Sequence, residues 1–227
     1  MKVLAIDTAT EALSVALQVN DEISDQFEIC PQQHSQKLLP LVKAVLADAG
    51  VSLQQLDALV FGHGPGSFTG VRIATGMVQG LAYGAQLPVV GVSTLAAMAQ
   101  QAIATTGAQR VVSAIDARMS EVYLGQFVNH QGLALADSEE VVCSPDDAVA
   151  QLPAINYQTA GTGWQAFEPL QQARHNATNT DILYPHARYM LALAQPKIAA
   201  GEGVEAMSVM PVYLRDKVTW KKLPGRE

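Results

Sequence analysis

The sequence contains few of the residues that usually signal metal, redox or nucleic-acid chemistry. It has two cysteines, Cys30 and Cys143, too far apart in the chain for a metal-binding or redox motif. Charged residues make up 15% of the chain, and the 14 Lys and Arg against 21 Asp and Glu leave a net charge of −7. An extended nucleic-acid surface needs clustered cations to displace counterions, so this composition argues against one.

Long apolar runs are missing too. No stretch approaches the roughly 20 apolar residues that a membrane span requires, and the chain opens directly on a strand pattern without a charged-then-apolar leader. We therefore expect a cytoplasmic protein with no membrane partner. The Asn176-Ala177-Thr178 sequon is then a chance match.

Hydrophobic residues, by contrast, make up 49% of the 227 residues, enough for a large core in one domain or in two lobes of about 100 residues each. Apolar periodicity predicts strands and helices in a clear order in the first half. The predicted strands are 2–7, 11–18, 21–29, 56–61 and 88–92, and the predicted helices are 35–49, 70–84 and 93–104. Antiparallel strands followed by strand–helix alternation are typical of a ribonuclease-H-like lobe.

A weak internal repeat indicates a second such lobe. Ile6-Asp7 ends the first strand, and Ile115-Asp116 ends a similar strand that is again followed by an alternating one, 121–128. We expect an α/β protein of two lobes with mixed sheets flanked by helices. The predicted divisions are a first lobe at 1–105, a smaller second lobe at 106–186, a C-terminal helix and segment at 187–215 that pack back on the first lobe, and a basic tail at 216–227; residues 137–180 show no pattern with chemical meaning.

The most distinctive motif is the glycine-rich loop 61–70, Phe-Gly-His-Gly-Pro-Gly-Ser-Phe-Thr-Gly, between a strand and a helix. A strand, a glycine turn and a helix can present backbone N–H groups to an anion or to another backbone. No P-loop lysine follows it, and we expect Ser67 or Thr69 to cap the helix.

Four motifs together resemble one known family. They are Ile6-Asp7-Thr8, His34-Ser35 with Leu38-Leu39-Pro40, the run from Gly64 to Arg72, and Pro211-Val212-Tyr213-Leu214-Arg215. The chain is similar along nearly its whole length to the bacterial TsaB (YeaZ) family. The resemblance implies two actin-like (ASKHA) lobes and a role in making threonylcarbamoyladenosine in tRNA.

The resemblance also implies partners. Members of that family are non-catalytic paralogues of the TsaD/Kae-type enzyme, with which they pair through the first lobe, alongside a TsaE-like ATPase. We accordingly expect a scaffold subunit that pairs with a TsaD-like paralogue or with itself and meets tRNA only through the complex. ATP and a metal ion are expected in the partner subunits, with neither cofactor held by this chain alone.

Residues that carry chemistry in the family's catalytic relatives are replaced in this chain. Actin-like ATPases hold phosphate on two Asp-x-Gly turns, and here Ala9 and Arg118 stand where the glycines would serve. At most, vestigial nucleotide residues remain at Asp7, Thr8, Gly161 and Gly163. The catalytic paralogues' His-x-x-x-His metal motif is replaced by Ser93 and Ala97.

The two remaining histidines of interest lack companions. His34 has no metal-binding neighbour and is expected to be a structural or capping residue at the start of a helix, and His63 has no cysteine or carboxylate beside it. We predict no catalytic and no metal residues. A weak actin-like ATPase or a glycoprotease-type peptidase is the alternative: Ser67 lacks the flanking glycines of a nucleophile elbow, but a Ser–His–Asp set on other spacing stays open.

Function is instead expected on two helices that carry more apolar surface than one buried stripe needs. Gly76, Gly80 and Gly84 recur every four residues, and a helical glycine costs about 1 kcal/mol relative to alanine, so close approach of another element is the usual explanation. The alternative is packing inside the chain's own lobe. The predicted partner-interface residues are Leu38, Leu41, Val42, Val45, Arg72, Thr75, Gly76, Met77, Gly80 and Leu81, and a charge at Leu41 or Met77 is expected to weaken pairing.

Overall fold

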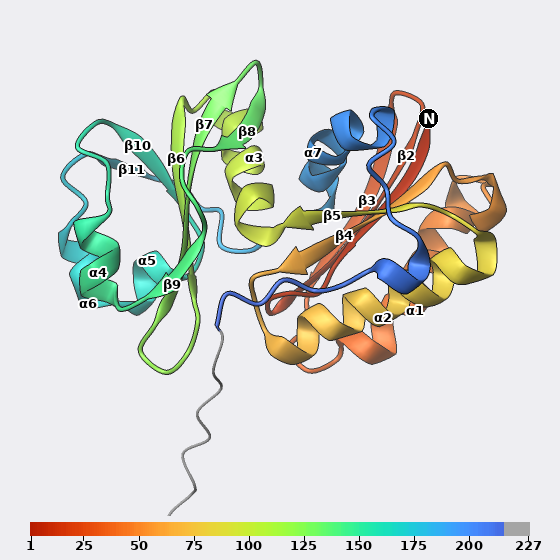
Figure 1. Ribbon diagram of the computed structural model, residues 1–227, viewed down its shortest axis with the longest axis horizontal. Coiled ribbons are helices and arrows are strands. Elements are labelled where there is room, and N and C mark those ends of the chain that lie inside the picture. Colours follow the sequence, from red (N-terminus) through yellow and green to blue (C-terminus); the bar gives the residue numbers. More distant parts are fainter. Residues whose placement is uncertain (216–227) are drawn as a thin grey trace, which may run out of the picture.

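The fold is built on two mixed sheets, one in each half of the chain (Figure 1). The structure is a computed structural model that describes residues 1–215. The predicted basic tail at 216–227 lies outside the described residues. In the first sheet the strand order is β3-β2-β1-β4-β5, with β1–β3 antiparallel and β1, β4 and β5 parallel. These strands are β1 (Lys2–Asp7), β2 (Ala12–Val19), β3 (Glu22–Ile29), β4 (Ala58–Gly64) and β5 (Val89–Ser93).

The second sheet repeats this topology. Its order is β11-β10-β6-β7-β8, with β6–β8 antiparallel, β6, β10 and β11 parallel, and β9 added beside β7. The strands are β6 (Arg110–Asp116), β7 (Val122–His130), β8 (Leu133–Ala136), β9 (Val141–Cys143), β10 (Tyr157–Ala160) and β11 (Ala177–Asn179). Read from β8 to β11, this order matches the first sheet read from β3 to β5, strand for strand. The prediction of two similar α/β lobes is therefore confirmed.

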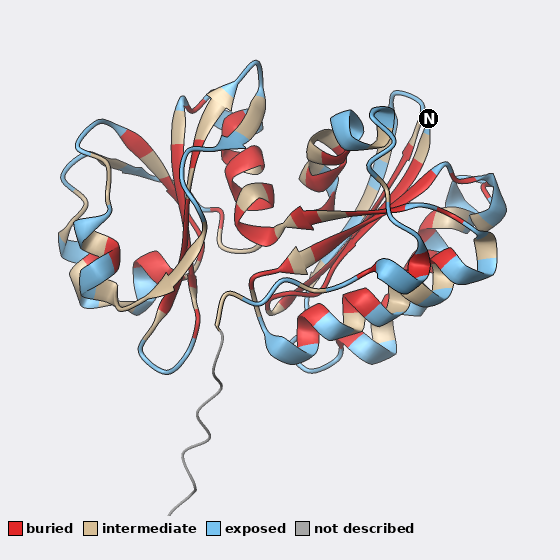
Figure 2. Ribbon diagram, in the orientation of Figure 1, coloured by how far each residue is buried: buried red, intermediate tan, exposed pale blue. Residues whose placement is uncertain are grey.

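Helices cover both faces of the first sheet. Helices α1 (His34–Asp48) and α2 (Phe68–Ala85) bury one stripe each against one face, together with Leu4, Ile6 and Leu59 of the strands. Helix α7 (Ala187–Ala199) returns from the end of the chain to the other face, where Met190 and Leu191 pack on Val3 and Val60. Figure 2 shows β1, β2 and β4 as largely buried and the edge strand β3 as exposed or intermediate.

Helix α3 (Thr94–Thr106) joins the two lobes. It packs on α7 and also covers one face of the second sheet, where Leu95 and Met98 meet Val111 and Phe127. The opposite face is covered by three short helices, α4 (Pro145–Ala150), α5 (Gly163–Ala166) and α6 (Glu168–Gln172). Residues 1–215 also contain two single 3-10 turns, η1 (Leu53–Gln55) and η2 (Ala206–Ser208).

Most predicted elements shift by only a few residues, but the segment 137–180 holds more structure than its sequence indicates. It folds into the short elements from β9 to β11, none longer than six residues. Such short elements carry too few turns or alternations for periodicity to register. Among residues 1–215, no helix combines the length and the apolar character needed to cross a bilayer.

Candidate functional site

A cleft of about 1160 Å³ opens between the lobes where the first strands of both sheets end. Its walls come from the turn after β1, the glycine-rich loop before α2, the turn after β6, and the last described residues of the chain. In a two-lobe fold of this kind the ends of the strands are where a ligand would be held. The residues on each wall show what the cleft can do.

The glycine-rich loop packs directly on the first turn. Ser67 N–H donates to the carbonyl of Ala9 at 2.7 Å, and Thr8 Oγ1 donates to the carbonyl of Gly70 at 2.6 Å. A Cβ at Gly66 would lie 2.3 Å from the Ala9 oxygen, so only glycine allows this approach. The loop therefore holds the first turn within the lobe, and the Thr8 hydroxyl and Ala9 carbonyl have partners inside the chain.

The predicted capping role of the loop serine is confirmed. Ser67 is the N-cap of α2, and its Oγ accepts a hydrogen bond from Gly70 N–H at 3.3 Å. An N-cap of this kind satisfies one of the open N–H groups of the first turn of a helix. The serine singled out by the peptidase hypothesis thus has a structural partner.

Asp7, one of the vestigial nucleotide candidates, is fully buried. Its Oδ1 accepts from Ala9 N–H at 3.1 Å, and its Oδ2 has no partner within the described residues. The Oδ2 atom faces Gly62 and Met190, so the carboxyl points to the α7 side of the sheet. Burial raises the pKa of Asp7 from 3.8 to about 7, with the Ala9 hydrogen bond acting in the opposite direction.

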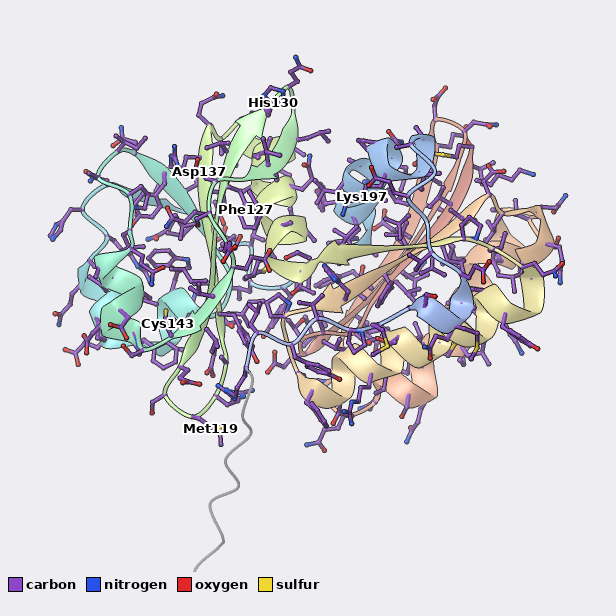
Figure 3. The ribbon with its side chains drawn as sticks, viewed as in Figure 1. Met119, Phe127, His130, Asp137, Cys143 and Lys197 are labelled. Carbon is purple, nitrogen blue, oxygen red and sulfur yellow. The ribbon has the colours of Figure 1, made fainter. Side chains whose placement is uncertain are left out.

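The turn after β6 is the second-lobe counterpart of the first turn. Asp116 Oδ1 accepts from Arg118 N–H at 2.8 Å, the same residue spacing as Asp7 and Ala9. Arg118, Met119 and Ser120 all have positive φ, which side chains rarely adopt; Figure 3 labels Met119 on this turn. The Arg118 guanidinium bridges Asp116 and, across the cleft, Glu11, each at 2.8 Å.

The C-terminal segment 209–215, which we call the strap, runs from the first lobe to this turn (Figure 1). Val212 N–H donates to the carbonyl of His63 at 2.7 Å, and Arg215 donates to the carbonyl of Ala117 at 3.1 Å and pairs with Glu121. The strap therefore ties the glycine-rich loop to the second lobe. The Arg215 guanidinium is thus held by the second lobe.

The other two vestigial candidates have packing roles. Gly161 has φ of +101°, and a Cβ there would lie 2.1 Å from the carbonyl oxygen of Ala114. A Cβ at Gly163 would lie 2.9 Å from Val122 Cγ2. Both glycines let the start of α5 lie against β6 and β7.

Ser93 and Ala97, where the sequence was expected to lack a metal motif, lie at the start of α3. Ser93 is the N-cap, accepting from Ala96 N–H at 3.2 Å, and its hydroxyl donates to Glu140. Burial raises the pKa of Glu140, and the Ser93 hydrogen bond partly opposes this. Ala97 is completely buried. Across residues 1–215, no three His, Cys, Asp or Glu side chains gather closely enough to hold a metal ion.

The two histidines also have structural surroundings. His34 begins α1, and its ring hydrogen-bonds the carbonyl of Ala12 at 3.2 Å, so it ties the helix to β2, while the N-cap position belongs to Gln33. His63 packs beside Phe61, and burial, reinforced by the charge of Lys197, lowers its pKa to about 4. It is therefore neutral at physiological pH.

One Ser–His–Asp set does exist, and sequence reasoning missed it. Ser14 Oγ lies 3.3 Å from His186 Nδ1, and His186 Nε2 lies 3.2 Å from Asp25 Oδ2. Ser14 is completely buried, however, and its Oγ accepts from Ala187 N–H at 2.9 Å. A nucleophile must be reachable by its substrate; this set instead holds the N-terminus of α7 on the edge of the first sheet.

The predicted partner face divides into two groups. One group was predicted wrongly, because its side chains are buried in the first lobe and cannot contact a partner. This group is Leu38, Val42, Val45 and Thr75. A helix with two apolar faces does not reveal which one meets its own sheet, and these four lie on the inner face. Leu41, Met77 and Leu81 are half-buried against the same core.

The outer side of α2 is open. Arg72, Gly76 and Gly80 are exposed, and a Cβ added at Gly76, Gly80 or Gly84 would meet no atom within 4 Å. The glycines therefore do not serve packing inside the lobe. Exposed residues spaced along this helix form one stripe from Phe68 to Gly84 (Figure 2), which we call the α2 stripe.

Known proteins are similar in sequence to this chain over its full length. The tRNA threonylcarbamoyladenosine biosynthesis protein TsaB of Haemophilus influenzae is 47% identical, with 100% of this chain and 99% of the relative aligned. The protein of the same name from Escherichia coli (strain K12) is 46% identical, with both chains fully covered. The chain belongs to the TsaB family.

The TsaB family assignment agrees with structure and with a wider relationship. The solved structure of YeaZ from Pseudomonas aeruginosa has a TM-score of 0.87 and 46% identity to this chain, covering 94% of it and 99% of the YeaZ chain. The family model described as tRNA N6-adenosine threonylcarbamoyltransferase, TsaD, matches residues 23–223. The resemblance inferred from the four motifs is confirmed.

The structure of this TsaB-family chain gives a role to the motif 211–215, for which the sequence alone indicates none. Tyr213 Oη accepts from Arg72 Nε at 2.8 Å, so the strap reaches the α2 stripe as well as the second lobe. The spacing of 141 residues between them leaves no local signal. Only the motif's presence in the family pattern marked the segment.

Proposed function

We propose that this chain is a non-catalytic scaffold subunit in the synthesis of threonylcarbamoyladenosine in tRNA. It pairs with the catalytic TsaD-like paralogue, helps to recruit a TsaE-like ATPase, and meets tRNA only through the complex. Support for the pathway comes from the names of the full-length relatives. Support for a scaffold role comes from the residues at the cleft and on α2.

The observation that carries the proposal is the open glycine face of α2. Three helical glycines cost the isolated lobe about 3 kcal/mol relative to alanine. Nothing in the described chain lies close enough to use the space they leave. A partner helix that approaches closely along Gly76 and Gly80, with half-buried Leu41, Met77 and Leu81 at its flanks, offsets that cost.

The fold of the partner supports the same surface. The TsaD family model matches most of this chain, so a TsaD-like protein has equivalent helices in its own first lobe. Two such helix pairs associate around a pseudo-two-fold axis, and a second copy of this chain uses the same surface to form a homodimer. ATP and the metal ion belong to the partner subunits in this proposal.

The interior of the cleft supports a role without catalysis by this chain. The first turn is occupied by the glycine-rich loop, the second is bridged to Glu11 by Arg118, and Ser93 and Ala97 supply no metal ligand. Most polar groups of both turns are thus engaged within the chain, and the unpartnered Asp7 Oδ2 faces Gly62 and Met190 and not the cleft. The outer surface is left as the part available for function.

The test compares bulky substitutions on and off the α2 stripe. Gly76→Gln and Gly80→Gln place a side chain in open space and should leave the fold intact, while the control Ala104→Gln adds the same group at an exposed position of α3. Light scattering after size exclusion, with and without the TsaD-like paralogue, should show a one-to-one complex that the two stripe variants weaken and the control does not. Equal pairing by all three would contradict the placement.

The alternative is an enzyme of the actin-like ATPase or peptidase class. Isothermal titration of the isolated chain with ATP and Mg²⁺ separates the scaffold from the ATPase. We expect no binding heat at micromolar nucleotide; saturable binding with slow ATP turnover would favour the ATPase instead.

A further inference from the structure

Three side chains at the start of the α2 stripe form a stacked cluster, the Phe68–Arg72–Tyr213 cluster. The Arg72 guanidinium carbon lies 3.6 Å from the centre of the Phe68 ring and 5.8 Å from that of Tyr213. The two ring centres are 5.7 Å apart. Arginine stacked on aromatic faces keeps its donor edge exposed and loses part of its rotamer freedom before any partner arrives.

The hydrogen bonds of Arg72 leave one edge of the guanidinium unused. Its Nε donates to Tyr213 Oη at 2.8 Å, which fixes the plane of the group. Among residues 1–215, no carboxylate lies within ion-pair distance of Arg72 and no acceptor meets its two terminal nitrogens. The other described arginines all have a carboxylate or a carbonyl at these nitrogens.

The strap is held in place on both sides of Tyr213. The preceding residue, Val212, is bonded to His63, and Arg215 is held by Glu121 and the turn after β6. The tyrosine hydroxyl therefore reaches Arg72 from a segment that both lobes anchor. A preorganised donor pair of this kind suits a bidentate acceptor.

A carboxylate on a protein fits this cluster better than a phosphate of RNA. Arg72 is the only charged residue of α2, and its neighbours on the stripe are glycines and exposed aromatic rings. Nucleic-acid binding draws on several clustered cations, whereas an Arg amid aromatic and apolar surface is typical of the centre of a protein interface. The chain's net charge of −7 also disfavours RNA.

We propose that the Phe68–Arg72–Tyr213 cluster receives an Asp or Glu side chain of the TsaD-like paralogue, bound by two N–H donors of Arg72. The inference rests on the proposed pairing and names the polar anchor at one end of the α2 stripe. Phe68 and Tyr213 act as positioning residues that hold the guanidinium flat and its outer edge open. The glycine face supplies close packing, and Arg72 supplies orientation.

The experiment measures the affinity of the TsaD-like paralogue for Arg72→Gln, Arg72→Lys and Tyr213→Phe variants, at low and high salt. Arg110→Gln is the matched control, since it removes the same charge from a second-lobe arginine that does not line the cleft. We expect Arg72→Gln to weaken binding about tenfold to a hundredfold and to reduce its salt dependence. Arg72→Lys should recover part of the loss, and Tyr213→Phe should cost about twofold to fivefold.

The outcomes separate this inference from the proposed function. Binding of Arg72→Gln within twofold of the unchanged chain, while Gly76→Gln still weakens pairing, overturns the carboxylate site alone. Unchanged pairing with weaker binding of tRNA by the assembled complex assigns the cluster to phosphate and overturns it as well. If the unchanged chain does not bind the paralogue, the proposed function fails and this inference fails with it.

Discussion

The buried carboxyl of Asp7 gives the sharpest quantitative prediction. Replacing it by asparagine removes a group whose pKa rises from 3.8 to about 7 on folding, because burial disfavours its charged form. The difference corresponds to about 4 kcal/mol of free energy that the folded state loses once the group is ionised. The asparagine side chain would keep an oxygen for the Ala9 N–H but place an amide N–H₂ where Oδ2 has no partner, at a cost of about 1–3 kcal/mol.

The sign of the pH dependence follows from the direction of the pKa change. Between about pH 4 and pH 7 the folded state holds a proton on Asp7 that the unfolded state has released, so stability falls as the pH rises through this range and levels off above it. Asp7→Asn should therefore be more stable than the unchanged chain by about 1–3 kcal/mol at pH 8. At pH 4 the order should reverse, by about 1–2 kcal/mol.

The assay is urea unfolding followed by circular dichroism at a series of pH values from about 4 to 8. Asp116→Asn is the matched control, because Asp116 makes the same turn in the second lobe but is partly exposed and paired with Arg118. The comparison separates the effect of the buried carboxyl from the loss of the turn hydrogen bond that both aspartates make. An Asp7→Asn variant that is less stable at pH 8 and keeps the pH profile of the unchanged chain would refute the reasoning.

Three further predictions concern packing and the strap. Gly62→Ala should destabilise the protein by about 3 kcal/mol or more, because the added Cβ would lie 1.7 Å from the buried carboxylate oxygen, whereas Gly76→Ala should stabilise it by about 0.5–1 kcal/mol in thermal unfolding. Ser14→Ala should lower the free energy of unfolding by about 1–2 kcal/mol, because it removes the acceptor at the start of α7. Casein hydrolysis by this variant should not differ from that by the unchanged chain. Hydrolysis that depends on Ser14 would contradict a purely structural role. Arg215→Met should cost about 1–2 kcal/mol and loosen the lobes, measured by urea unfolding and by the radius of gyration in solution scattering, while an unchanged radius would contradict the anchoring role of the strap.

The first lobe could be predicted closely from the sequence because its signals are local. The apolar run of β1, the alternation over 11–18, the stripe of α1, and the glycine-rich loop with Ser67 near its end each involve residues close to one another in sequence. The repeat of Ile-Asp in both halves correctly indicated a second lobe of the same design. The short elements of the second lobe lacked such signals.

The candidate site could be predicted only in part. The open side of α2 was inferred from glycine spacing, but the assignment of Leu38, Val42 and Val45 to the same surface was wrong, because helical periodicity defines faces without saying which one meets the sheet. The absence of usable metal ligands at Ser93 and Ala97 was visible in residue types alone. The roles that Ser93 and Ala97 do have, in capping and packing α3, could not be read from residue types.

By itself the sequence determined the order of elements in the first lobe and the two-lobe α/β design, since these depend on residue type, short-range period and an internal repeat. It also indicated the TsaB family, through four motifs that resemble it. Only the tertiary structure decided that the Asp7 carboxyl is turned away from the cleft, that Ser14 and Asp25 meet His186, and that Tyr213 orients Arg72. These contacts join residues more than a hundred positions apart, or depend on which side of a sheet a helix returns to. Such relations arise when the whole chain packs, and no local pattern encodes them.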